Sequence, residues 1–90
     1  MRLRWTPAAA EDLESIHTYL SQHHPSFAQP TIRLLYNSAR SLRNFTERGR
    51  PGTISETREL VLPRLPYIIV YRVTDQVIEI LRIYHGAQDR

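Results

Sequence analysis

The residues in this sequence that could do chemistry are mostly arginines, and three of them interrupt the apolar C-terminal half, at Arg58, Arg72 and Arg82. All 12 basic residues are arginine, and the chain has a net charge of +3 and a pI of about 9.8. A guanidinium stays charged and donates a planar fork of N–H groups that fits carboxylates and phosphates. These residues therefore offer recognition of oxyanions, in nucleic-acid phosphates or in an acidic protein partner. A GC-rich coding bias is the alternative explanation for the absence of lysine.

Other kinds of site have little support. The chain has no cysteine, which excludes disulfides, thiolate metal sites, iron–sulfur clusters and cysteine nucleophiles. The adjacent His23 and His24 lack the spacing of metal ligands, so we predict no metal and no cofactor. No apolar run approaches the roughly 20 residues of a membrane helix, and no signal peptide opens the chain. We therefore expect no membrane contact and a cytoplasmic location.

Length and composition predict a single domain over residues 1–90. The chain is 41% hydrophobic and 23% charged, as ordinary globular proteins are. A chain of 90 residues buries only a modest core, so a partner protein could complete it.

The N-terminal half predicts one strand and two helices. Residues 2–5 alternate arginine with Leu3 and Trp5, which is typical of a strand. Thr6 and Pro7 then form a helix start, and the first helix is expected to end before Pro25. A second apolar stripe at helical spacing comprises Ile32, Leu35, Ala39 and Leu42, and is extended by Phe45. Pro30 would kink a helix that begins near Ser26. The short connection favours an antiparallel helix hairpin.

The C-terminal half predicts strands. Residues 47–52 have loop composition, and strands are expected over 58–62, 67–73 and 77–84. The element order is β-α-α-β-β-β. The predicted fold class is α+β, in which the N-terminal strand and the helix hairpin pack on a mainly antiparallel sheet of three to four strands.

Strand alternation assigns side chains to two faces of this sheet. A tight hairpin with Val73 opposite Val77 places Ile68 opposite Arg82. One face then contains Arg58, Leu60, Leu62, Ile68, Val70, Arg72, Ile78, Ile80, Arg82 and Tyr84. The other face is more uniformly apolar, so we expect the helices to cover it. The first face becomes an exposed aliphatic groove with arginines, which is typical of a partner site. Its alternative is that loops cover it.

The order and spacing of several strings resemble the RelE/ParE superfamily of toxins from type II toxin–antitoxin systems. The first strings are Trp5 with Ala9, Asp12, Leu13, Ile16 and Leu20, then Gly49-Arg50 and Arg58-Glu59-Leu60-Val61. The longest are Pro66-Tyr67-Ile68-Ile69-Val70-Tyr71-Arg72-Val73 and Ile80-Leu81-Arg82-Ile83-Tyr84-His85-Gly86-Ala87. The resemblance spans nearly the whole chain.

This resemblance implies a cytoplasmic bacterial toxin that a ParD/RelB-like antitoxin neutralises in a tight complex, with higher-order toxin–antitoxin oligomers possible. An acidic, amphipathic antitoxin tail that folds on binding suits the aliphatic groove with arginines. The antitoxin-binding residues expected on it are Leu60, Leu62, Ile68, Val70, Arg72, Ile78, Ile80 and Arg82.

The superfamily divides by mechanism, because RelE-type members cleave mRNA in the ribosome and ParE-type members poison DNA gyrase. RNA cleavage needs a proton acceptor for the 2′-hydroxyl, cations at the phosphate and a proton donor for the leaving oxygen. RelE-type toxins place one arginine after the tyrosine of the central strand and another on the last strand. Here these positions are Ile68 and Arg82, so the arginine pair is incomplete.

We therefore expect ParE-like poisoning of gyrase, which is not enzymatic. The alternative is a ribosome-dependent mRNA endoribonuclease in which Arg82, Arg58 and His85 are catalytic and Glu47 is a candidate base. A third possibility is a neutralised member without toxicity. Structural roles compete with these chemical roles: Arg82 could form an ion pair with Glu56 or the antitoxin, Arg58 could be solvated, and His85 could bond locally.

Target contacts are expected at Arg33 and Arg40 of the second helix and at Tyr84, whose ring could stack on a base. A solvated helix face and ordinary strand packing are the competing explanations. Trp5 is expected in the core.

Overall fold

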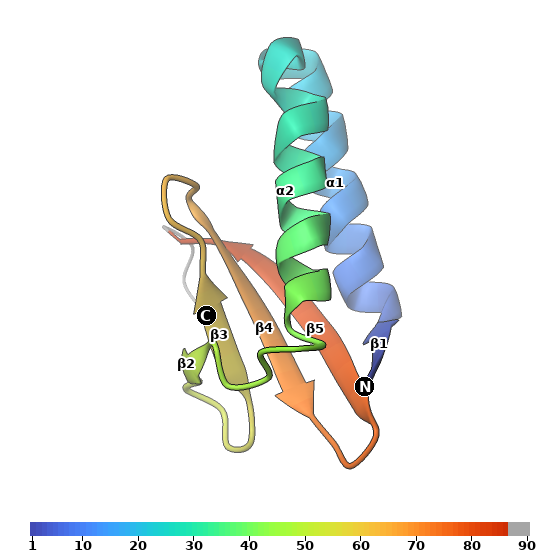
Figure 1. Ribbon diagram of the computed structural model, residues 1–90. Helices are drawn as coiled ribbons and strands as arrows, with labels where there is room; N and C mark the ends of the chain where they lie inside the picture. Colours follow the sequence, from blue (N-terminus) through green and yellow to red (C-terminus); the bar gives the residue numbers. More distant parts are fainter. Residues whose placement is uncertain (87–90) are drawn as a thin grey trace.

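A computed structural model describes residues 1–86 of the chain and shows a helix hairpin lying against one side of a sheet (Figure 1). The elements are β1 (Arg2–Trp5), α1 (Pro7–His23), α2 (Pro25–Ser41), β2 (Arg50–Pro51), β3 (Arg58–Val61), β4 (Tyr67–Val73) and β5 (Val77–His85). The far ends of both helices project beyond the sheet. The α+β class is confirmed, and the elements follow the predicted order with one additional short strand, β2.

The sheet has five strands in the order β1-β5-β4-β3-β2. The N-terminal strand β1 pairs in parallel with the C-terminal strand β5, and the other three pairings are antiparallel. The fifth strand is β2, two residues long, in a segment that the sequence analysis interpreted as loop. A pair of residues at an edge leaves too little pattern to distinguish a strand from a loop.

The helix hairpin forms where the sequence predicts it. The Thr6 hydroxyl accepts the Ala9 N–H at 3.2 Å and so caps the first turn of α1, and Pro7 stands at the first helical position. Only His24 separates the two helices, because Pro25 opens α2 directly. The helix continues through Pro30, which removes one hydrogen bond close to the helix start.

The core lies between the hairpin and the sheet. Both helices contribute small and branched side chains, and β3, β4 and β5 contribute the rest. The buried cluster comprises Ala9, Leu35, Ala39, Leu42, Leu60, Leu62, Tyr67, Ile69, Tyr71, Ile78, Ile80 and Ile83, with Leu3 and Trp5 packed against it. Trp5, which was expected in the core, is partly buried and packs against it. Phe45 does not extend the stripe of α2, because its side chain is exposed in the turn after the helix.

The strand register differs from the prediction by one residue at the β4–β5 turn and by two farther along. Val73 lies opposite Ile78, and Ile68 lies opposite Tyr84. The further shift arises at Leu81, since Tyr71 pairs with Ile80 whereas Val70 pairs with Arg82. A β-bulge places one extra residue in β5 and reverses the alternation on either side of it.

This register corrects the expected antitoxin-binding set. Four of its eight residues, Leu60, Leu62, Ile78 and Ile80, are buried beneath the helices and not on an exposed face. Ile68 and Val70 lie on the other side of the sheet but are only 6% and 8% exposed, so no open aliphatic groove forms there. Val61 and Val73, which are not in the expected set, are exposed. Within the described part of the chain, no helix is long and apolar enough to cross a membrane.

Candidate functional site

The side of the sheet that faces away from the helices is called the open face here. The strand register arranges its residues in three rows across the strands. The rows are Val61-Ile68-Tyr84, Arg50-Glu59-Val70-Arg82 and Arg72-Glu79-Arg4. Arginines and carboxylates alternate with aliphatic residues on this face, so it is where the predicted chemistry of the arginines can be examined.

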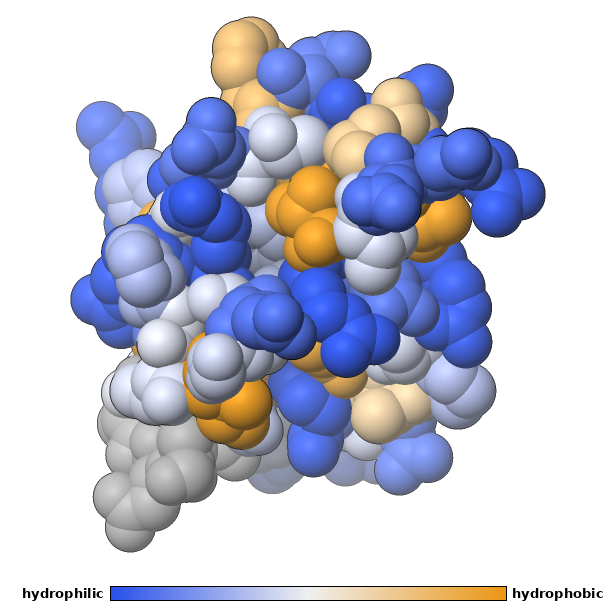
Figure 2. Space-filling model, turned by 90° about the horizontal axis from the view of Figure 1, so that it is seen from below, coloured by the Kyte–Doolittle hydropathy of each residue, from blue (hydrophilic) through white to orange (hydrophobic). Residues whose placement is uncertain are grey.

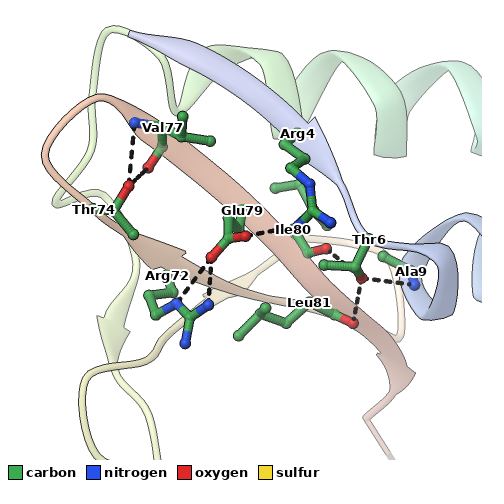
Figure 3. A network of polar contacts seen from close by, with 9 residues as sticks. All are labelled: Arg4, Thr6, Ala9, Arg72, Thr74, Val77, Glu79, Ile80 and Leu81. Atoms are coloured by element: carbon green, nitrogen blue, oxygen red, sulfur yellow. Dashed lines mark hydrogen bonds and ion pairs between the residues drawn. The ribbon is translucent and has the colours of Figure 1, made fainter.

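Glu79 binds two arginines at once and joins three strands (Figure 3). Its Oε2 accepts a hydrogen bond from Arg4 Nη1 at 2.7 Å. Its Oε1 accepts one from Arg72 Nε at 3.0 Å and another from Arg72 Nη2. The hydrogen bonds from Arg72, followed by the charges of Arg72 and Arg4, lower the pKa of this carboxyl below its ordinary value of 4.5. Arg72, expected to contact an antitoxin, is thus already paired within the chain.

Arg82, the leading candidate for phosphate recognition, is held by Asp12 of α1. Its Nε and Nη2 donate to the two oxygens of Asp12 at 2.8 Å and 3.1 Å. Asp12 also accepts the N–H of Ile83 at 2.9 Å, beyond the point where β1 ends opposite Ile80. Asp12, and not Glu56, is the carboxylate that meets Arg82, and this ion pair raises the pKa of the guanidinium.

The neighbours of Arg82 on the open face are an aromatic ring and aliphatic side chains. Its Cζ lies 5.3 Å from the centre of the Tyr84 ring, in cation–π geometry. Ile68, opposite Tyr84, occupies the central-strand position at which RelE-type toxins are expected to carry arginine. The structure therefore brings Arg82 and Tyr84 together, and Ile68 leaves the row of Val61, Ile68 and Tyr84 without a guanidinium.

Arg58 does not join them, because it lies on the helix-facing side of β3, opposite Tyr71. It donates to the carbonyl of Gly49 at 2.7 Å and lies 3.6 Å from Glu47, whose side chain is 85% exposed. Arg58 therefore holds the segment that leads from α2 to β2. The proposed base Glu47 lies beside Arg58 and away from Arg82.

The same segment is fixed by the buried Tyr71. Its hydroxyl accepts the N–H of Gly49 and donates to the carbonyl of Thr46, both at 2.8 Å. Burial is the main cause that raises the pKa of Tyr71. A Cβ on Gly49 would lie 2.7 Å from the Tyr71 ring and 2.9 Å from the Glu59 carbonyl, so only glycine fits here. Tyr71 is a structural residue that the sequence analysis did not single out.

His85 ends β5 opposite Tyr67, and the two rings meet edge to face with centroids 5.6 Å apart. Tyr67 and His85 share the side of the sheet opposite to Arg82, since Ile83 and His85 alternate with Arg82 and Tyr84. The three residues proposed for catalysis, Arg82, Arg58 and His85, are therefore not assembled around one point.

The target-binding residues are also divided. Arg33 and Arg40 are exposed on α2, whereas Tyr84 lies on the open face across the sheet. A single flat contact cannot include all three. Asp12 and Glu79 are the polar residues whose roles the sequence analysis missed, because each one's partners lie 7 to 75 residues away along the chain.

Five of the six strand arginines in residues 1–86 have a carboxylate within 4 Å. Arg50, for example, lies 3.0 Å from the buried Glu59. Residues 1–86 also contain no group of three or more histidine or acidic side chains that could hold a metal ion. The sheet arginines therefore serve mainly to tie strands and segments together.

An open depression of about 600 Å³ lies where the β4–β5 turn meets the segment before β3. It is lined by Pro51, Glu56, Thr57, Arg58, Arg72, Val73 and Thr74. Seen from below Figure 1, the molecule is mainly hydrophilic, and hydrophobic residues appear as separate spots (Figure 2). No broad apolar surface is visible on this view.

Comparison with known proteins gives a consistent result. Residues 3–90 match the family model described as the ParE toxin of the type II toxin–antitoxin system parDE. Y4kP of Sinorhizobium fredii, which has a provisional toxin name, is 39% identical over 87 residues, covering 97% of this chain and 90% of that protein. Toxin RelE2 of Caulobacter vibrioides is 39% identical over 84 residues, covering 93% of each.

A solved structure of the chromosomal ParDE toxin–antitoxin system from P. aeruginosa has the same fold. It superimposes with a TM-score of 0.87 at 31% sequence identity, over 94% of this chain and 95% of that one. Together with the family match over almost the full length, this similarity shows that the chain belongs to the ParE toxin family of type II toxin–antitoxin systems, within the RelE/ParE superfamily.

Proposed function

We propose that this toxin acts in the bacterial cytoplasm as a single domain, stops growth by poisoning DNA gyrase and is neutralised by a ParD/RelB-like antitoxin. The match to the ParE family model and the likeness to the ParDE system support this choice. The gyrase target itself follows from the ParE branch of the superfamily.

One observation carries the choice of gyrase over RNA: among residues 1–86, the open face has no pair of guanidinium groups free of a carboxylate partner. Ile68 stands in the central strand, and Arg82 uses two of its nitrogens to bind Asp12. In-line cleavage of RNA needs cations aimed at the phosphorane and an acid and a base on either side of it. Arg58 and His85 face the other side of the sheet and cannot complete such a set without rearrangement.

The antitoxin surface must differ from the one expected from sequence. With four aliphatic residues in the core, the open face offers Arg72, Arg82 and the exposed Val61 around the nearly buried Ile68 and Val70. An acidic antitoxin segment would meet these arginines and exchange with Glu79 or Asp12 for their N–H groups. Association of several toxin–antitoxin units remains part of the proposal.

The alternative is a ribosome-dependent mRNA endoribonuclease. It is favoured by the 39% identity to Toxin RelE2 and by the Arg82–Tyr84 pair, in which a base could stack on the ring beside a cation. In that case release of Arg82 from Asp12 would have to accompany substrate binding.

Expression of the chain without an antitoxin in a bacterial host distinguishes the candidates. Gyrase poisoning predicts growth arrest with induction of the DNA-damage response and intact transcripts. Transcripts cut at defined codon positions without that response would establish the nuclease instead. Unchanged growth, with the protein present and folded, would show that it is not toxic. Arg82→Gln is the informative variant, because it abolishes a nuclease and leaves the gyrase phenotype.

A further inference from the structure

Formal charge is distributed unevenly along this chain. Residues 33–48 contain four arginines and one acidic residue, namely Arg33, Arg40, Arg43, Arg48 and Glu47, and so carry +3. The remaining residues contain eight arginines and eight acidic residues and sum to zero. The entire net charge of the protein therefore belongs to α2 and the segment that follows it, in green in Figure 1.

The arginines of this region differ from those of the sheet in having no acidic partner. Arg33, Arg40 and Arg43 are exposed, and within residues 1–86 none of them has a carboxylate within 4 Å. The single acidic residue of the region, Glu47, lies beside Arg58. The positive charge of α2 is therefore left uncompensated, whereas that of the sheet is neutralised within the protein.

The cations stand among neutral hydrogen-bonding groups on one side of the helix. Arg33, Asn37, Arg40 and Asn44 follow one another at spacings of four, three and four residues, which places them along one stripe. A depression of about 380 Å³ is lined by Asn37, Arg40, Ser41, Arg43 and Asn44.

The turn after α2 extends this stripe. Arg48 Nη1 donates to Ser41 Oγ at 2.7 Å, which brings a fourth guanidinium to the helix end. The Phe45 ring is 64% exposed in the same turn. We call the stripe and this turn the α2 basic surface.

We propose that the α2 basic surface binds the phosphodiester backbone of nucleic acid, and specifically duplex DNA. In such complexes, the N–H groups of arginine and asparagine side chains donate hydrogen bonds to phosphate and sugar oxygens. Asn37 and Asn44 add amide donors beside the guanidinium groups, as phosphate and sugar oxygens require. The choice of duplex rests on the proposed function, because a poison of gyrase acts on an enzyme that holds duplex DNA.

Fluorescence anisotropy with a labelled 20-base-pair duplex at 50, 100 and 200 mM NaCl tests this proposal. Each neutralised phosphate contributes about −0.9 to the slope of log affinity against log salt, so about three contacts predict a slope near −3. Arg40→Gln with Arg43→Gln should weaken binding at 50 mM salt at least about fivefold and make the slope shallower by about 2.

The matched control is Arg2→Gln with Arg64→Gln, which removes the same charge from two exposed arginines outside the surface. This control should bind DNA within twofold of the original protein. Equal losses in both double variants, or no binding of the duplex at 50 mM salt, would overturn the proposal. Tighter binding of a 20-nucleotide RNA, or binding of a polyglutamate peptide alone, would also overturn it.

Gyrase inhibition is measured separately, in a supercoiling assay with the unchanged protein. Failure to inhibit gyrase would contradict the proposed function, whereas the DNA-binding comparison uses no gyrase and stands on its own result.

Discussion

The ion pair between Arg82 and Asp12 determines what the most prominent arginine of this toxin can do. Two guanidinium nitrogens and one backbone N–H converge on the Asp12 carboxylate. The edge of the guanidinium formed by Nε and Nη2 is therefore occupied by Asp12, and a phosphate would have to approach the other edge, at Nη1. At the scale of the residue, Arg82 therefore acts as a support between α1 and β5.

A double-mutant cycle measures this support. Arg82→Gln and Asp12→Asn should each lower the free energy of unfolding by about 1 kcal/mol, because the pair is partly exposed to solvent. The coupling energy should be about 0.5–1 kcal/mol in urea titrations. Arg82→Gln should inhibit gyrase as well as the original protein does. A coupling energy of zero would contradict the structural role.

The hydroxyl of Tyr71 should contribute to stability through its two hydrogen bonds. Tyr71→Phe should lower the free energy of unfolding by about 1–3 kcal/mol, because the Gly49 N–H and the Thr46 carbonyl both lose their partner. Equilibrium denaturation measures the change. Tyr36→Phe, at an exposed tyrosine of α2, is the control and should change stability by less than about 0.5 kcal/mol.

Among the elements, the segment between α2 and β2 depends on close approach of its backbone to β4. Gly49→Ala places a methyl group against the Tyr71 ring and hydroxyl. The expected loss is about 1–3 kcal/mol, with increased hydrogen exchange in residues 45–50. Gly86→Ala, where a Cβ meets its nearest atom at 3.3 Å, should be tolerated much better. Equal effects of the two substitutions would contradict the packing described for this segment.

The attachment of β1 to the sheet should depend on pH through Glu79. The folded protein holds this carboxyl ionised below the ordinary pKa of 4.5, so the unfolded chain binds more protons in that range. Stability contributed by Glu79 is therefore present above pH 4.5 and is lost as pH falls through the lowered value.

Thermal denaturation between pH 6 and pH 3 tests the role of Glu79. Glu79→Gln should be less stable than the original protein at pH 6, and the difference should shrink toward pH 3. Glu14→Gln, which removes a carboxylate from the exposed surface of α1, is the control and should run parallel to the original protein. A difference for Glu79→Gln that does not change with pH would contradict the ion-pair account.

The sequence predicted the elements better than it predicted their register. Thr6, Pro7 and the apolar stripe of α2 determine the hairpin by local rules. The side chains from Tyr67 to Tyr71 point alternately to the two sides of the sheet, as expected. The bulge at Leu81 escaped prediction because the residues around it, Ile80, Leu81 and Ile83, are all apolar, so no alternation marks the extra residue. Each shift of register moves side chains to the other face, which is why Ile78 and Ile80 were misplaced.

The acidic partners of the arginines could not be predicted from the sequence either. Asp12 and Arg82 are 70 residues apart, and Arg4 and Glu79 are 75 residues apart, so only the parallel pairing of β1 with β5 and the hairpin beside it bring them together. The side of the sheet on which Ile68 lies could be predicted, because it depends only on the alternation of the central strand. That residue still carries the choice between the two mechanisms.

The arginines of the whole molecule fall into two sets. Five of the six strand arginines are paired internally and stabilise the fold. Those of α2 and the segment after it have no carboxylate within 4 Å in residues 1–86, and this region carries the net charge. Within residues 1–86, the open face has no assembled set of acid, base and cation. This arrangement supports the proposal that the toxin binds a macromolecular target and does not cut RNA.

The most direct test incubates the purified toxin with gyrase, supercoiled plasmid and ATP, and then denatures the protein to reveal double-strand breaks trapped by the enzyme. The account predicts that linear plasmid accumulates with toxin concentration, that Arg82→Gln behaves in the same way, and that ribosome-bound mRNA incubated in parallel stays intact. The proposed mechanism would be contradicted if the plasmid stayed supercoiled with no linear product and the mRNA were cut by the original toxin but not by Arg82→Gln.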